Sequence, residues 1–460
     1  MTGDVRVRAT VIDLLQGALG AKVLTDPAET EPFSHDRSHH PWQLADAVVR
    51  CTSTQDVVDV LRICSDTTTS VVPFGTGTGL EGGANLSRGS VCLDVSGMNR
   101  ILRLDPGSLD VTVEAGVKRS ELNPVLAEHG LFFPVGPGVD ASIGGMAATG
   151  ASGTNAVYFG TMRESVLGLT VVLADGTVVH TGGRARKSAA GYDLTHLFIG
   201  SEGTLGVITE ITLRVYGIPP STVLAVCAFG DLVAAARVVQ RALGEGIHLA
   251  RAELLDDIMV GAIDDFSGLS LERAPTLLLE FIGGPAAVAE DAERVRALAE
   301  DEGSVNFGLV ESAPERDRIW QARHDALPAA AAMKNGAQTW STDVCVPISR
   351  LADCIGQTKA DLDASSVLAP IAGHVGDGNF HLAFVLSPDD TAGFAEAQRI
   401  NERLVERAVV MGGTCTGEHG IGVGKTEDLI REHPTGVPLM RALKGTLDPL
   451  GIMNPGKVLR

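Results

Sequence analysis

Pro73-Phe74-Gly75-Thr76-Gly77-Thr78-Gly79-Leu80 is a glycine-rich stretch. It continues a short apolar segment, Val71–Pro73, that has the β-branched composition of a strand. Glycine permits tight turns and close backbone approach, so several N–H groups of such a stretch can point at one anion. The stretch therefore predicts a phosphate-binding loop, with a plain glycine-rich turn as the alternative. Gly77-x-Gly79-x-x-Gly82 also has the spacing of a dinucleotide fingerprint, but the residues that follow do not open the helix this motif requires.

Two further loops share this composition. One runs through Pro137-Gly138-Val139-Asp140-Ala141-Ser142-Ile143-Gly144-Gly145 and on to Ser152 and Gly153. The other is Gly200-Ser201-Glu202-Gly203-Thr204-Leu205-Gly206. Three loops of small and hydroxyl residues in one half of a chain favour a large flat ligand that carries a pyrophosphate over three structural turns.

The three loops resemble the FAD-binding domain of the vanillyl-alcohol oxidase/p-cresol methylhydroxylase (PCMH-type) superfamily. The block Lys187-Ser188-Ala189-Ala190-Gly191-Tyr192-Asp193-Leu194 is similar in particular to its D-lactate dehydrogenase and glycolate oxidase branch, and the resemblance extends from about Asp36 to Lys457. It implies that the first loop holds the pyrophosphate and that the later loops line the isoalloxazine. No histidine lies in these loops, so we expect the FAD to be non-covalent. The cofactor-binding residues implied are Pro73, Gly75, Thr76, Gly77, Thr78, Gly79, Pro137, Gly138, Ser142, Gly145, Ser152, Gly153, Glu202, Gly203, Gly206, Val207, Ile208 and Asn454.

The pattern of elements changes near Pro219 and Pro220, where longer helices begin to alternate with strands. We predict an α+β protein with three parts: a PCMH-type FAD-binding domain (1–218), an α+β substrate or cap domain with an antiparallel sheet (219–445), and a C-terminal segment that packs on the FAD domain (446–460). One strand is expected at Thr342–Val346, and one helix from Pro314 to about Leu327.

The second half contains two glycine-flanked histidine motifs, Gly373-His374-Val375-Gly376-Asp377-Gly378-Asn379-Phe380-His381 and Thr414-Cys415-Thr416-Gly417-Glu418-His419-Gly420. Two imidazoles and a carboxylate are a common ligand set for a divalent ion with open positions. The resemblance implies His374, His381 and Glu418 as metal ligands and His419 as the catalytic base. The ligand types leave Zn²⁺ and Mn²⁺ equally open.

Substrate contacts are implied by the resemblance at Arg323 and Asn379. Arg323 matches an arginine that clamps the substrate carboxylate, for which a bidentate fork is well suited; without the resemblance it would be taken for a surface helix arginine. Asn379 is expected to hold the substrate hydroxyl or a metal-bound water. Ser341 stands where relatives that act on dicarboxylates carry a lysine, which favours a monocarboxylate such as lactate.

Composition limits the partners and the compartment. The 460 residues carry a net charge of −20, which argues against nucleic acid and anionic lipid as ligands, and no apolar run reaches the length of a membrane span. Seven cysteines without a CxxC pair indicate reduced thiols, and no secretory signal is evident. We therefore expect a cytoplasmic protein, at most peripheral to a membrane through its electron acceptor. A homodimer is compatible with the sequence.

These features combine into one expected reaction, the FAD-dependent oxidation of a small D-2-hydroxy acid, with D-lactate as the first choice. The electron acceptor could be a cytochrome, a quinone or another flavoprotein. The alternatives are a glycolate oxidase subunit, a D-2-hydroxyglutarate dehydrogenase, and, from a different class, a non-redox flavin-dependent transferase of the alkylglycerone-phosphate synthase type.

Overall fold

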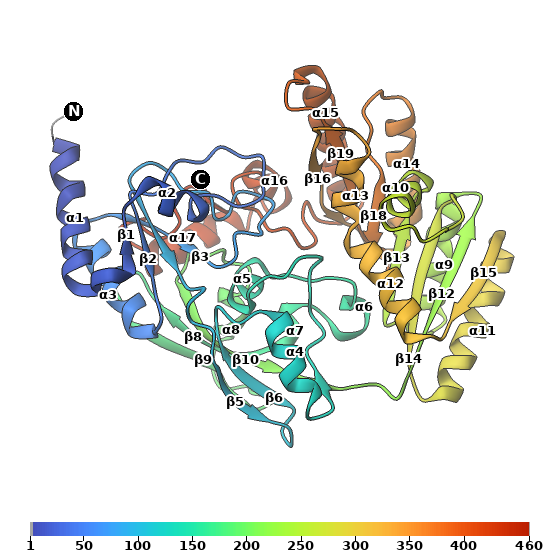
Figure 1. Cartoon of the computed structure of the whole chain (residues 1–460), viewed down its shortest axis with the longest axis horizontal. Coiled ribbons are helices and arrows are strands. Elements are labelled where there is room, and N and C mark those ends of the chain that lie inside the picture. The colour runs from blue at the N-terminus through green and yellow to red at the C-terminus, as the bar shows by residue number, and fades with distance from the viewer. Residues whose placement is uncertain (1–2, 460) are drawn as a thin grey trace. The chain divides into compact units, whose positions relative to one another are not determined.

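The computed structural model describes residues 3–459, which form two compact units (Figure 1). Unit 1 contains the chain up to Ser152, then Thr161–Ile218, and finally the chain from Glu418 onward. Unit 2 contains Gly153–Gly160 and Pro219–Gly417. The sequence-based bounds at 218/219 and 445/446 remain a prediction about domains, because compactness does not show which segments fold independently.

Unit 1 is built on two main sheets. The first has the order β1 (Val23–Leu24), β2 (Ala47–Arg50), β4 (Ser90–Asp94), β3 (Ser70–Phe74), in which β2, β4 and β3 run parallel. The second is antiparallel, with the order β5 (Ile101–Asp105), β6 (Asp110–Glu114), β10 (Val207–Arg214), β8 (Val166–Val172), β9 (Val178–Gly182). A small ribbon pairs β7 (Leu131–Phe132) with β11 (Tyr216–Gly217). The helices are α1 (Gly3–Leu19), α2 (Pro27–Thr30), α3 (Thr54–Asp66), α4 (Arg119–Ala127), α5 (Ile143–Thr149), α7 (Met162–Ser165), α8 (Thr195–Phe198), α16 (Thr426–Glu432) and α17 (Val437–Leu447).

Both faces of the first sheet are buried, which explains its continuous apolar strands. Alternate residues of a strand point to opposite faces. Val49 and Val71 belong to the large core that also holds Val113 of the second sheet, whereas Val48 and Val72 belong to a smaller cluster on the other face. Each fully buried side chain of this size contributes about 1.5–3 kcal/mol. The strand β3 is thereby fixed, and it ends where the first glycine loop begins.

The end of the chain covers the open edge of β3. Met453 forms a parallel bridge with Val71, whose N–H donates to the carbonyl of Ile452, while the N–H of Asn454 donates to the carbonyl of Val71. An uncovered strand edge would leave backbone groups unpaired. The C-terminal segment therefore continues the first sheet of unit 1 beside the glycine loop.

Unit 2 contains an eight-stranded sheet, and every pair in it is antiparallel. The order is β15 (Ser304–Val310), β12 (Ser221–Phe229), β14 (Thr276–Gly283), β13 (Arg251–Leu255), β18 (Ile371–His374), β19 (Asn379–Leu386), β16 (Gln338–Ser341), and β17 (Val344–Cys345) also pairs with β19. The helices are α6 (Ala156–Phe159), α9 (Leu232–Gly244), α10 (Asp257–Ser267), α11 (Pro285–Asp301), α12 (Ala313–His324), α13 (Ala326–Ala332), α14 (Leu351–Asp363) and α15 (Thr391–Val410). The expected α+β class and antiparallel sheet are confirmed.

Helices pack on both faces of this sheet (Figure 1). The helices α10, α12 and α13 share one core with Leu224 and Leu278, while α9 and α11 contact the same two strands, β12 and β14. The neighbouring residues Ala225 and Leu277 are also fully buried, as expected for the opposite face. Within the described residues, no helix is long and apolar enough to cross a membrane.

Two local expectations were wrong. The strand expected at Thr342–Val346 covers only Val344–Cys345, and between it and β16 Thr342 Oγ1 accepts the N–H of Leu382 while Asp343 accepts the side-chain amide of Asn379. The backbone N–H of Thr342 still donates to the carbonyl of Leu382 at 2.9 Å, so these side-chain hydrogen bonds add to the pairing between β16 and β17. The helix expected from Pro314 ends at His324, and a second helix begins after Asp325.

Candidate functional site

The first glycine loop contacts the second within unit 1. A Cβ on Gly75 would lie 2.6 Å from Oγ of Ser142. The two segments are therefore so close that only glycine fits at position 75 without a shift. Ser142 is the N-cap of α5, and its hydroxyl accepts the N–H of Gly145 at 3.3 Å. The third loop also reaches the first, because a Cβ on Gly203 would lie 2.8 Å from the ring of Pro73.

The first loop fits an anion such as a pyrophosphate. The backbone N–H groups of residues 76–79 donate to no protein acceptor in the described part of the chain, while the carbonyl of Gly79 accepts from the N–H of Arg37. The hydroxyls of Thr76 and Thr78 lie 3.2 Å apart at the same loop. Successive N–H groups of this kind form a concave anion site. These residues therefore fit the phosphate part of FAD.

Other residues that were expected to bind the cofactor have structural roles in unit 1. Val207 and Ile208 are buried in the core of unit 1, so only their backbone could face a ligand. The amide of Asn454 donates to the carbonyls of Gly83 (2.9 Å) and Glu202 (2.7 Å). Asn454 thus ties two glycine-rich segments together. Gly153 belongs to unit 2 rather than to the unit that holds the other loops.

Glu202 anchors the segment that follows His419. Its carboxylate accepts the N–H groups of Ile421 (2.7 Å) and Gly422 (2.9 Å). Burial raises the pKa of Glu202 to about 7, although these two hydrogen bonds oppose the shift. The residue also has a positive φ of 50°. A buried carboxyl at a strained backbone position indicates a segment held in place by its surroundings.

A second buried acid, Glu81, lies beside His419. Its Oε1 is 4.0 Å from Nδ1 of His419 and 3.2 Å from Nζ of Lys425, and its Oε2 is 3.7 Å from Nε2 of His40. Burial alone would raise the pKa of Glu81, but Lys425, His40 and His419 together lower it. His419 therefore lies in unit 1 next to a carboxylate that remains ionised.

The two histidines of the expected metal site lie on neighbouring strands of unit 2. His374 ends β18 and His381 lies in β19, with ring centroids 5.5 Å apart. Nδ1 of His374 is 2.6 Å from Oε1 of Glu253, and Nδ1 of His381 is 2.9 Å from the carbonyl oxygen of Thr342. An ionised carboxylate and a carbonyl only accept, so each Nδ1 donates. An uncharged ring held in this way presents the lone pair of Nε2, which is the arrangement that a metal ion requires.

Arg323 lies in the same buried group. Its Nε donates to Oε2 of Glu253 at 2.8 Å, and its Nη2 lies 2.6 Å from the same oxygen in an ion pair. The guanidinium that was expected to clamp a substrate carboxylate is therefore engaged on its Nε and Nη2 side by a protein carboxylate. Nη1 makes no hydrogen bond to the part of the chain that the structure describes, so it keeps both donors for a ligand. Burial would raise the pKa of Glu253, but His374 and Arg323 lower it.

Asn379 has a positioning role in unit 2. Its amide donates to Asp343 and to the carbonyl of Val344, both at 2.7 Å, and Asp343 also accepts the hydroxyl of Thr416 at 2.6 Å. A Cβ on Gly417 would collide with Asn379. The chain is thus fixed against the histidine strands up to the residue immediately before Glu418.

Sequence reasoning missed Glu253, Glu81 and Asp343. Glu253 lies within the apolar stretch Ala252–Leu255, and an acid inside an apolar strand is a signal that could have been used. Its partner could not be found, because His374 is 121 residues away and the pairing depends on strand register.

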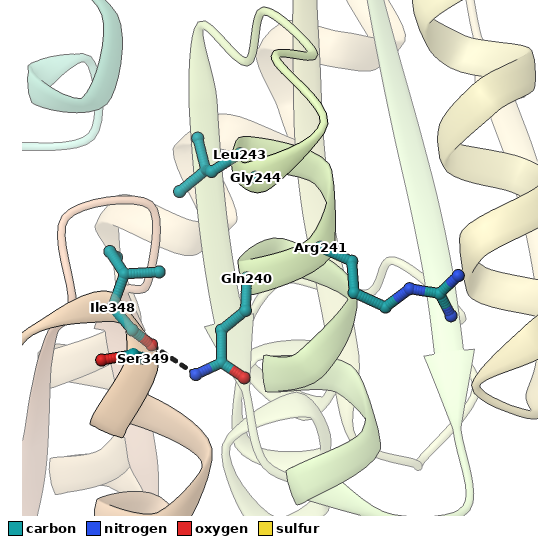
Figure 2. Close-up of a pocket in the computed structure, with 6 residues that line it drawn as sticks. All are labelled: Gln240, Arg241, Leu243, Gly244, Ile348 and Ser349. Carbon is teal, nitrogen blue, oxygen red and sulfur yellow. Dashed lines mark hydrogen bonds between the residues drawn. The ribbon is translucent and has the colours of Figure 1, made fainter.

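A shallow pocket elsewhere in unit 2 contains none of the expected site residues. Figure 2 shows it between the end of α9 and the start of α14, where the amide of Gln240 donates to the carbonyl of Ile348. Arg241 turns away and pairs with Asp301 and Glu302. This pocket offers no catalytic group.

Two family models match the chain. The model "FAD binding domain" matches residues 45–182, and the model "FAD linked oxidases, C-terminal domain" matches residues 218–458. Similar solved structures include 4-ethylphenol oxidase from Gulosibacter chungangensis (TM-score 0.81, 18% identity, 98% of this chain and 97% of that one) and p-cresol methylhydroxylase (TM-score 0.78, 18% identity, 100% and 97%). An alkyldihydroxyacetonephosphate synthase is also similar (TM-score 0.76, 16% identity, 97% and 85%). At these identities the likeness shows the fold, and it confirms the expected PCMH type.

Curated relatives are more similar in sequence. A probable mitochondrial D-lactate dehydrogenase of Danio rerio is 50% identical over 94% of this chain and 88% of its own length. A mitochondrial D-lactate dehydrogenase (cytochrome) of Arabidopsis thaliana is 46% identical over 92% and 74%. The glycolate oxidase subunit GlcD of Bacillus subtilis is 32% identical over 93% and 91%.

These relatives overturn one expectation. We expected a cytoplasmic protein, but four relatives that are 39–50% identical carry mitochondrial names. The reasoning failed because reduced cysteines and an acidic composition describe a reducing, aqueous environment and do not distinguish one compartment from another.

Proposed function

The chain belongs to the family of FAD-linked oxidases, and we propose that it oxidises a small D-2-hydroxy acid, D-lactate foremost, to the 2-oxo acid. One observation carries the proposal: the ring centroids of His374 and His381 lie 5.5 Å apart, and His374 shares the buried carboxylate of Glu253 with Arg323. The names of the relatives at 39–50% identity support D-lactate as the substrate. The reaction balances as hydroxy acid plus FAD giving 2-oxo acid plus FADH₂.

The three glycine loops of unit 1 hold the FAD in this proposal. The N–H groups of residues 76–79 bind its phosphates, and the close approach of Gly75 to Ser142 and of Gly203 to Pro73 fixes the loops around it. When bound, the flavin supplies the acceptor for the hydrogen and electron pair that leave the substrate Cα. The residues of the chain bind and orient it but do not perform that chemistry.

His374 and His381 would hold a divalent ion, with Glu418 as the third ligand. The support for Glu418 is chain continuity, because Gly417 before it packs against Asn379 beside the histidine strands. Such an ion would supply Lewis acidity toward the hydroxyl oxygen of the substrate. Zn²⁺ and Mn²⁺ both suit this donor set.

Arg323 binds the substrate carboxylate through its remaining donors. The Nε and Nη2 side of the guanidinium already faces Glu253, so the contact uses Nη1 and is end-on rather than side-on. A guanidinium held in this way is immobile before substrate arrives, so little entropy is lost on binding. Ser341 is buried and its hydroxyl donates to the carbonyl of Thr342, so it offers no charge for a second carboxylate.

His419 accepts the hydroxyl proton of the substrate. The carboxylate of Glu81, 4.0 Å from Nδ1, offsets the positive charge that the ring gains. Glu202 holds the following residues, Ile421 and Gly422, and thereby limits movement of the ring. General-base catalysis of this kind typically contributes a factor of about 10²–10⁴.

A cytochrome is the electron acceptor that we propose, because several relatives are named for it. The test is anaerobic reduction of the bound flavin by D-lactate, L-lactate, glycolate and D-2-hydroxyglutarate, each with and without a chelator. We expect rapid bleaching by D-lactate, loss of that bleaching with chelator, and restoration by Zn²⁺ or Mn²⁺. Faster bleaching by glycolate than by D-lactate would favour the glycolate oxidase alternative. If no hydroxy acid reduces the flavin, the proposal is wrong and a non-redox transferase is favoured.

A further inference from the structure

Glu253 is fully buried and lies at the centre of the candidate substrate group in unit 2. It belongs to β13, and the antiparallel register places it directly opposite His374 on β18. The helix α12 brings Arg323 to the same carboxylate. One side chain thus touches a candidate metal ligand and the candidate substrate arginine.

The two oxygens of this carboxylate have separate partners. Oε1 accepts from Nδ1 of His374 at 2.6 Å, and Oε2 accepts from Nε of Arg323 at 2.8 Å and lies 2.6 Å from its Nη2 in an ion pair. A buried charge is tolerated when it is paired and its oxygens are hydrogen-bonded. Arg323 can only donate. The carboxylate is therefore the acceptor that both partners require at once.

We propose that Glu253 is a positioning residue that sets the tautomer of His374 and the direction of Arg323 together. This inference rests on the proposed function for the roles of those two residues. With Nδ1–H held by Glu253, His374 presents the lone pair of Nε2 to a metal ion. With its side-on face held by Glu253, Arg323 presents Nη1 to a substrate carboxylate.

The substitution Glu253→Gln separates this role from simple packing. A carboxamide has one accepting oxygen and one donating NH₂ group. Its oxygen must face Arg323, which cannot accept, so its NH₂ group faces Nδ1 of His374. Nδ1 must then accept, which moves the ring proton to Nε2 and removes the lone pair that binds the metal. Loss of such an outer partner typically lowers metal affinity by about 10–100-fold.

Glu280→Gln is the matched control. Glu280 lies on the neighbouring strand β14, is also buried, and accepts from Nε1 of Trp320 at 2.7 Å while pairing with Arg251 at 3.3 Å. It therefore has a similar environment in the same sheet, but within the described residues it forms no hydrogen bond or ion pair with His374 or Arg323.

The first measurement is the tautomer of His374, read by long-range ¹H–¹⁵N correlation on metal-free protein with labelled histidine. His374→Gln assigns the signal. We expect an Nδ1–H ring in the wild type and in Glu280→Gln, and an Nε2–H ring in Glu253→Gln. A wild-type Nε2–H ring, or an unchanged ring in Glu253→Gln, overturns the proposal. If Glu253→Gln does not fold, Glu253→Asp is measured in its place. Aspartate keeps both accepting oxygens on a shorter side chain, so His374 should retain its Nδ1–H while metal binding weakens.

The second measurement is Co²⁺ affinity, determined by competition with a chelator. We expect Glu253→Gln to bind at least about tenfold more weakly than the wild type, and Glu280→Gln to bind within about twofold of it. Equal loss in both variants overturns the proposal, because a general packing defect would then explain it. If the wild type itself does not bind Co²⁺ through His381, as His381→Ala would show, the metal part of the proposed function fails while the tautomer result still decides the role of Glu253.

Discussion

Gly203 lies so close to Pro73 that a Cβ on the glycine would be 2.8 Å from Cγ of the proline ring. The contact joins the third glycine loop to the first, and Gly203 has a φ of +70° that side chains rarely adopt. We predict that Gly203→Ala lowers FAD affinity by at least about tenfold. The proline ring of Pro73 cannot rotate away from the new methyl group, so the first loop must shift. A shift that costs about 1.4 kcal/mol corresponds to a factor of about 10 in affinity. The measurement is flavin occupancy of the purified protein together with the Kd for added FAD.

Gly200→Ala is the control for the backbone effect. Gly200 belongs to the same loop and has a φ of +78°, but no atom lies within 4 Å of the Cβ position. It should lose only the roughly 1 kcal/mol of left-handed strain and keep its flavin. If both variants lose FAD equally, the close approach to Pro73 is not what holds the loop.

A second prediction concerns His419. We expect His419→Gln to retain FAD but to slow anaerobic flavin reduction by D-lactate by about 10²–10⁴-fold, since the amide cannot take the hydroxyl proton. Stopped-flow absorbance checks this. The control is His433→Gln, an exposed histidine after α16 whose ring pairs with Glu432. Unchanged reduction in His419→Gln would remove the base assignment.

The sequence predicted the elements whose signals are local. The strand expected at Val71–Pro73, which is β3 at Ser70–Phe74, and the glycine loop after it follow from composition and spacing within a few residues. The motif around His374 and His381 was also visible, because both histidines lie on one hairpin of strands. Glu253 was not visible, since its role depends on a register formed between segments far apart in the chain.

The same limit explains Arg323. From the sequence its fork was expected to face the substrate, but in the structure the fork faces Glu253. A one-dimensional motif identifies a cation but not which of its donors are already used. The interrupted strand at Thr342 and Asp343 is a similar case, because strand propensity does not show the side-chain hydrogen bonds that this segment makes to Leu382 and Asn379.

The buried pair of Arg323 and Glu253 gives a third prediction. Arg323→Met should lower the free energy of unfolding of the protein by about 3–5 kcal/mol, because it removes the guanidinium partner of a buried carboxylate and leaves only the hydrogen bond from His374. Adding Glu253→Gln should recover part of this loss, since the buried charge is then gone. Urea unfolding of the single and double variants measures the coupling. Arg399→Met, which breaks the exposed pair with Glu396, should cost less than about 1 kcal/mol; simple additivity in the double variant would contradict the prediction.

The fourth prediction concerns the pH dependence of stability and Asp256. This residue caps α10, where its Oδ1 accepts the N–H of Met259 at 2.7 Å, and it is almost fully buried. Burial raises the pKa of Asp256 from 3.8 to about 7; its hydrogen bonds and Lys359 oppose the shift, whereas Asp257 adds to it. Between these two pKa values the folded state holds more protons than the unfolded state. The free energy of unfolding therefore falls as pH rises from about 4 to about 7 and is level above that range.

Asp256→Asn isolates this effect, because asparagine is an equally good N-cap and does not titrate. We expect the variant to gain stability relative to the wild type as pH rises, with little difference near pH 4. Between pH 5 and pH 8 the gain should be about 2–3 kcal/mol, since each pKa unit is worth about 1.4 kcal/mol. Urea unfolding of both proteins at the two pH values measures it. A stability difference that is the same at pH 5 and pH 8 would show that Asp256 is ionised in the folded protein throughout, and that its cap geometry, not its burial, determines its charge.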